Sequence, residues 1–71
     1  MVSEDAMKAV GGALLAARLS QKRSLDDIAT ATRISKSSLE DIENGRIPKL
    51  PLTYIRAFVK SYAVELGLNP E

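Results

Sequence analysis

The central part of the chain, from Leu25 to Gly45, contains two short amphipathic segments joined by a tight break, "TRIS". Ser24 precedes the first segment as a favourable N-cap, and Asp27, three residues later, makes a partial capping box. Ser35 caps the second segment, and Gly45 provides its C-terminal stop. Two short helices joined by so short a break form a helix-turn-helix arrangement.

Apolar residues lie on one face of each of these two helices. In the first helix this face contains Leu25, Ile28 and Ala29, and in the second it contains Leu39 and Ile42. We expect both faces to point into a shared core.

A further helix is predicted before this central pair, over residues 9–22. Its apolar face contains Leu15 and Leu19 at i,i+4 spacing, with Val10 and Leu14 around them. The adjacent glycines "GG" at residues 11–12 weaken the helix, so they either permit close packing or mark where it begins. Residues 1–8 are polar and predicted to be a flexible N-terminal segment, which leaves one domain over residues 9–71.

A last helix is predicted after the connector "RIPKLP", from about Leu52 to Leu66, with Pro51 as its first helical residue and Gly67 as its end. At about 100° per residue, its core stripe consists of Ile55, Val59, Tyr62 and Leu66. The predicted fold is therefore all-α, a four- to five-helix bundle with a central helix-turn-helix, the fifth element being a short turn after Gly67. Pro70 suggests the beginning of a linker.

The three aromatic residues of the chain all lie in this last helix. Tyr54 and Phe58 are neighbours at i,i+4, but they fall to one side of the core stripe that contains Tyr62. Large apolar groups at such a position are candidate anchors for a protein partner, although they could instead pack on the first helix or on the connector. Glu65 lies beside them as a candidate polar rim, whereas Arg56 lies on the opposite side and is interpreted as an ion-pair or packing residue.

Composition argues against catalysis and metal binding. The chain has 71 residues, a net charge of +1, no cysteine and no histidine. Thiolate nucleophiles, disulfides and the usual zinc sites are therefore excluded, and the adjacent carboxylates of the helices point in different directions. We expect no catalytic residue, cofactor, metal or small-molecule substrate. No apolar run approaches the roughly 18 residues of a membrane span.

Residues 25–45, "LDDIATATRISKSSLEDIENG", resemble the helix-turn-helix of the Cro/repressor-like (XRE) superfamily, whose fold is that of lambda repressor. The following segment, "LPLTYIRAFVKSYAVELGLNPE", is more specific. It looks like the end of the cytoplasmic domain of the RodZ-like family of bacterial cell-shape proteins, and the similarity extends over most of the chain.

The resemblance implies a non-enzymatic adaptor that binds the actin homologue MreB. RodZ-like proteins continue through a linker and a single membrane span, so this segment would lie on the cytoplasmic side of the inner membrane, and would meet the membrane only through a downstream segment. In that family the aromatic residues of the fourth helix face the partner. The matching positions here are Tyr54 and Phe58.

The alternative is a small DNA-binding regulator of the XRE type that places helix 35–44 in the major groove. Its candidate DNA contacts are Arg33, Lys36, Ser37 and Ser38. Residues 35–46 carry two basic and three acidic side chains, which disfavours contact with phosphates. Arg33 also stands in the turn where many DNA-binding relatives have glycine, which tolerates positive φ.

Overall fold

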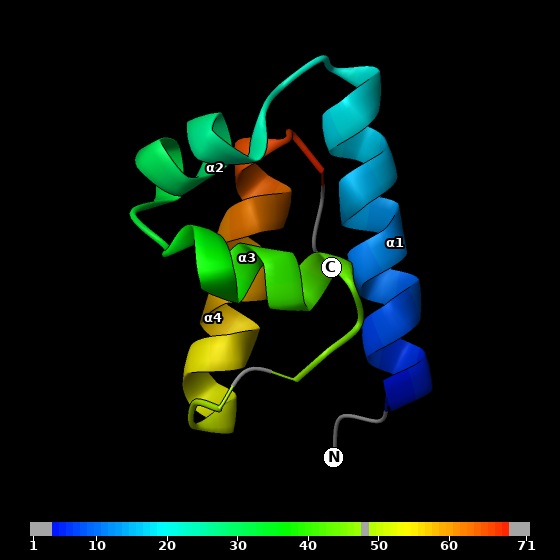
Figure 1. Cartoon of the computed structure of the whole chain (residues 1–71), viewed down its shortest axis with the longest axis vertical. Helices are drawn as coiled ribbons and strands as arrows, with labels where there is room; N and C mark the ends of the chain where they lie inside the picture. The colour runs from blue at the N-terminus through cyan, green and yellow to red at the C-terminus, as the bar shows by residue number, and fades with distance from the viewer. Residues whose placement is uncertain (1–3, 48, 69–71) are drawn as a thin grey trace.

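The computed structural model describes residues 4–47 and 49–68, and these ranges contain four helices and no strand. The helices are α1 (Glu4–Ser20), α2 (Leu25–Thr32), α3 (Lys36–Glu43) and α4 (Leu52–Glu65). Figure 1 shows α1 along one side of the molecule, α3 next to it and α2 on the side away from α1, with α4 passing behind α3 in this view. The all-α prediction is confirmed. The turn expected after Gly67 and the linker expected at Pro70 fall largely at residues 69–71, outside the described residues.

The start of α1 differs from the prediction. The helix begins at Glu4 rather than near Ala9, and Met7 is buried with only 3% of its surface exposed. Residues 4–8 are therefore a helical part of the domain, and their assignment to a flexible segment is wrong. A polar stretch with one apolar residue gives little periodicity, which is why the helix start was not visible in the sequence.

The buried face of α1 is also rotated from the expected one. Met7 and Leu14 are in the core, but Leu19 is 59% exposed and Val10 is 39% exposed. The contact between α1 and α3 occurs at Gly11, where an added Cβ would overlap the backbone carbonyl of Ile42. Gly11 thus permits close packing, and the alternative that the glycines mark the beginning of the helix is excluded.

The central helix-turn-helix forms as predicted. The Ser24 hydroxyl accepts a hydrogen bond from the Asp27 amide, and the Asp27 carboxylate accepts one from the Ser24 amide, so the capping box is complete. Ser35 caps α3 by accepting from the Ser38 amide. Between the two helices, Arg33 takes the left-handed conformation with φ 61°. Many DNA-binding relatives have glycine at this position, because glycine adopts a positive φ more easily.

One core joins all four helices. Its buried residues are Met7, Leu14, Ile28, Ile34, Leu39, Ile42, Ile55, Tyr62, Ala63 and Leu66. Ala17, Leu25, Ala29, Phe58 and Val59 pack against it and are partly buried. The predicted inward faces of α2, α3 and α4 are therefore confirmed.

The two ends of α4 follow from backbone chemistry. Pro51 is the N-cap rather than the first helical residue, and its carbonyl oxygen accepts from the amides of Tyr54 and Ile55. At the other end Gly67 has φ +76°, and the Leu68 amide donates to the carbonyl of Ala63, as in a Schellman motif. These bonds satisfy carbonyl groups that the end of the helix would otherwise leave unpaired.

Candidate protein-binding surface on the fourth helix

Tyr54 and Phe58 form an aromatic pair on the surface of α4. Their ring centroids are 6.5 Å apart and the rings are tilted by 48° to one another. Tyr54 is 56% exposed, whereas Phe58 is partly buried and packs against the core. The core thus supports the Phe58 ring, and the Phe58 ring in turn packs against the exposed ring of Tyr54.

Tyr62, the third aromatic residue, has a different environment. It is fully buried, and its hydroxyl donates a hydrogen bond to the carboxylate of Glu43. Burial and this carboxylate raise the pKa of the Tyr62 phenol well above its ordinary value of 10.0. The division predicted from the helical wheel, with Tyr62 inside, Phe58 at the boundary and Tyr54 exposed, is confirmed.

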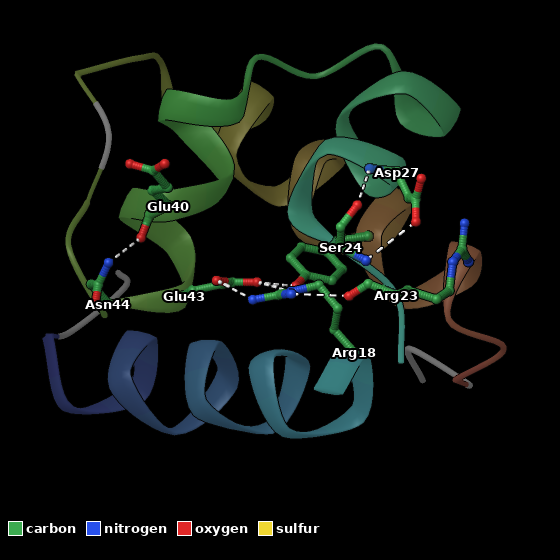
Figure 2. A network of polar contacts seen from close by, with 8 residues as sticks. Arg18, Arg23, Ser24, Asp27, Glu40, Glu43 and Asn44 are labelled. Atoms are coloured by element: carbon green, nitrogen blue, oxygen red, sulfur yellow. Dashed lines mark hydrogen bonds and ion pairs between the residues drawn. The ribbon is translucent and has the colours of Figure 1, made fainter. Parts of the chain in front are cut away.

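Glu43 connects Tyr62 to Arg18, and these three residues join three helices. Arg18 of α1 donates from Nε to Oε2 of Glu43 at 2.8 Å and from Nη2 to Oε1 at 3.3 Å. Figure 2 shows the two side chains pointing toward one another between α1 and α3. Their side chains are only 12% and 8% exposed, so this ion pair is largely shielded from solvent. The hydrogen bonds with Glu43 raise the pKa of the Arg18 guanidinium above its usual value.

The α1–α2 loop attaches to the end of α4 through a second set of polar contacts. Arg18 also donates to the carbonyl oxygen of Arg23 at 3.0 Å. Arg23 pairs with the Glu65 carboxylate at 2.8 Å and donates to the Glu65 carbonyl oxygen at 3.0 Å. Gln21 donates to the carbonyl of Leu66 at 2.7 Å. These polar contacts hold the C-terminal half of α4, while Ile55 in the core fixes the half that carries the Tyr54–Phe58 pair.

Sequence reasoning did not identify Arg18 and Glu43. Glu43 was counted only among the acidic side chains of residues 35–46, and Arg18 was not singled out, because neither position has a local pattern that separates an internal ion pair from a solvated charge. The two residues are 25 positions apart, and their contact depends on the crossing of α1 and α3.

Two expectations about charges on α4 have different outcomes. Glu65 is partly buried, and its carboxylate is occupied by Arg23, so its role as a polar rim for a partner stays a prediction. The interpretation of Arg56 is wrong, because this residue is exposed and takes part in no ion pair within residues 4–47 and 49–68.

The four candidate DNA contacts lie close together in the turn and the first turn of α3. Arg33, Lys36 and Ser37 are exposed. Ser38 is partly buried and its hydroxyl accepts from that of Ser35 at 3.0 Å, which reduces its availability to a base edge. The Lys36 ammonium lies 3.4 Å from a carboxylate oxygen of Asp26. This carboxylate would compete with a DNA phosphate for the Lys36 charge.

The acidic residues of α3 are distributed differently from what the sequence count suggested. Glu43 points inward to Arg18, and Asp41 pairs with Arg46 at 2.9 Å. Glu40 is exposed, and its backbone carbonyl accepts from the Asn44 side chain at 2.7 Å (Figure 2), while its carboxylate has no partner among the residues that the structure describes. The outward face of α3 therefore presents less unpaired negative charge than a count of its residues implies.

The described residues hold no group of three or more acidic, histidine or cysteine side chains placed to bind a metal ion. Within that same part of the chain, none of the helices combines the length and apolar character needed to cross a bilayer.

This architecture, with capped helices around a tight turn, defines a helix-turn-helix domain. Residues 13–71 match the helix-turn-helix domain family, which covers most of the chain, and the protein belongs to that family. A curated relative is the protein named uncharacterized membrane protein YmfM of Bacillus subtilis (strain 168), which is 43% identical over 49 residues. The match covers 68% of this chain but 17% of that relative, so the chain corresponds to a small part of it. No solved structure matches the chain.

Proposed function

We propose that this domain is a non-enzymatic adaptor that binds the actin homologue MreB on the cytoplasmic side of a bacterial membrane. The observation that carries the proposal is the Tyr54–Phe58 pair, with one ring 56% exposed and the other supported by the core. Aromatic residues on a rigid element dominate protein-binding hot spots, because they bury a large area at low entropic cost.

Other exposed apolar residues near the start of α4 favour a protein partner. Ile47, Leu50 and Leu52 are 44%, 39% and 44% exposed, and all three closely precede Tyr54 in the sequence. A run of exposed apolar residues beside an aromatic pair is typical of an interaction surface. The resemblance to RodZ-like proteins supplies the identity of the partner, and the relative named as a membrane protein is consistent with a membrane-associated parent.

The proposal is tested by measuring the affinity of the purified chain for purified MreB at ~150 mM salt. We expect Tyr54→Ala to weaken binding by ~2 kcal/mol, because truncation removes a hot-spot side chain. Leu19→Ala is the matched control, since Leu19 is equally exposed but lies on α1. Equal losses in the two variants would show that the effect is not specific to the α4 surface.

DNA binding by α3 is the second candidate, and one observation favours it. Glu43 is paired with Arg18 inside the domain, so its carboxylate is absent from the face of α3 that would meet the DNA backbone. A mixed-sequence duplex retained at ~150 mM salt, together with loss of retention in Lys36→Ala, would support this reading over the adaptor.

A further inference from the structure

An open hollow of about 350 Å³ lies between the end of α2 and the second half of α4. Its lining residues are Ala31, Thr32, Lys60, Ser61, Val64 and Glu65. None of them is among the buried core residues, and Val64 is 57% exposed. The hollow is therefore a feature of the surface and not a packing defect.

The hollow continues the face that carries the aromatic pair. Along α4, Tyr54, Phe58, Ser61 and Glu65 follow one another at spacings of four, three and four residues, which places them in one row along the helix. Ser61 and Glu65 also line the hollow. A protein that covers Tyr54 and extends along this row reaches the hollow next.

The polar groups of the hollow differ in whether the chain already uses them. The Glu65 carboxylate is occupied by Arg23 at 2.8 Å. The Thr32 hydroxyl donates to the Ile28 carbonyl at 2.7 Å and accepts from the Ile34 amide at 3.3 Å.

Two polar groups of the hollow remain unused. The ammonium of Lys60 and the hydroxyl of Ser61 have no hydrogen-bond or ion-pair partner within the described part of the chain. A free cation next to a free hydroxyl is complementary to a carboxylate, which accepts hydrogen bonds from both. The exposed Val64 and the small Ala31 supply apolar walls beside this polar pair.

We infer that the hollow receives an acidic side chain of the protein partner, bound by Lys60 and Ser61, with an apolar neighbour placed against Val64. This inference rests on the proposed function, because it assigns the chemistry of the partner segment that follows the Tyr54–Phe58 contact. It makes Lys60 a determinant of partner specificity, since a like charge opposite Lys60 would be repelled.

Affinity measurements with purified MreB separate this inference from the proposed function. We expect Lys60→Glu to weaken binding at least about tenfold, because it places two carboxylates opposite each other. Arg56→Glu makes the same charge change one turn earlier on α4, outside the hollow, and should alter affinity by less than about twofold. Circular dichroism of both variants checks that α4 is retained.

The outcomes are distinct. If Tyr54→Ala loses binding while Lys60→Glu retains it, the inference is wrong and the proposed function stands. Equal losses of affinity in Lys60→Glu and Arg56→Glu would mean that the net charge of α4, and not a contact at Lys60, determines binding. That result would overturn the inference. Absence of binding by the unaltered chain rejects the proposed function and the inference with it.

A zero-length carbodiimide crosslink gives a direct readout. The reagent activates a carboxylate, and an amine that is in contact with it then forms an amide. We expect mass spectrometry to find Lys60 joined to an aspartate or glutamate of MreB. Lys60→Arg should abolish this crosslink but keep the affinity, since arginine retains the charge and lacks a reactive amine. Crosslinks at other lysines without one at Lys60 would contradict the inference.

Discussion

Arg18 and Glu43 form a two-contact ion pair across the junction of α1 and α3, with distances of 2.8 and 3.3 Å between their nitrogen and oxygen atoms. The Tyr62 hydroxyl donates to the same carboxylate, so a single acidic group connects α1, α3 and α4. Charged groups that are taken out of water need partners of this kind, because an unpaired buried charge is strongly unfavourable. The position of α4, and with it that of Tyr54, therefore depends on Glu43.

The variant Glu43→Gln should lower the free energy of unfolding by about 3 kcal/mol, because it leaves the Arg18 guanidinium largely buried without a counter-charge. Chemical denaturation followed by circular dichroism measures this loss. The control is Arg46→Ala, which breaks the more exposed pair with Asp41 and should change stability by no more than ~0.5 kcal/mol. Similar losses in the two variants would mean that the Arg18–Glu43 pair is no more than a surface contact.

Tyr62 should make the domain sensitive to alkaline pH. Its pKa is raised in the folded state, chiefly by burial and also by Glu43, so the folded chain holds the phenol proton more tightly than the unfolded chain. The resulting stability is fully present below the unfolded pKa of about 10 and is lost as the pH rises toward the folded pKa. We therefore expect the free energy of unfolding to fall steadily above pH ~10.

Tyr62→Phe isolates this effect. The variant should be less stable near neutral pH by ~1.5–3 kcal/mol, since it loses a hydrogen bond to a charged group. Its stability should also fall less steeply above pH ~10 than that of the unaltered chain, because the lysines titrate in both proteins while the Tyr62 phenol is absent from one. Parallel pH profiles would contradict the role assigned to the phenol.

The two adjacent glycines of α1 should respond in opposite ways to the same substitution. Gly11→Ala should destabilise the domain by about 1–3 kcal/mol, because the new Cβ overlaps the Ile42 carbonyl and separates α1 from α3. Gly12→Ala meets open space and should stabilise the helix by up to ~1 kcal/mol. Thermal unfolding of the two variants side by side provides the test, and the same sign for both would refute the close contact at Gly11.

The sequence predicted those features whose cause lies within a few residues. The caps at Ser24 and Ser35 and the stops at Gly45 and Gly67 all depend on local backbone chemistry. The inward face of α4 also followed from local spacing, because a long helix with a strong apolar stripe has only one way to face a core.

Features that depend on contacts between helices were not predictable in this way. The buried face of α1 is centred on Gly11, which has no apolar side chain to indicate it, while the more hydrophobic Leu19 is exposed. Arg18 and Glu43 become internal only when α1 crosses α3. The hollow beside Lys60 likewise exists only because α2 ends next to α4.

The most direct test of the account is the affinity of this chain for purified MreB, measured at ~150 mM salt for the unaltered protein and for the Tyr54→Ala/Phe58→Ala variant, with a mixed-sequence DNA duplex as competitor. The account predicts that the unaltered chain binds, that the folded variant does not, and that the duplex fails to compete. A chain that ignores MreB but retains the duplex at this salt concentration would contradict it, and would identify α3, with Arg33 and Lys36, as the functional surface.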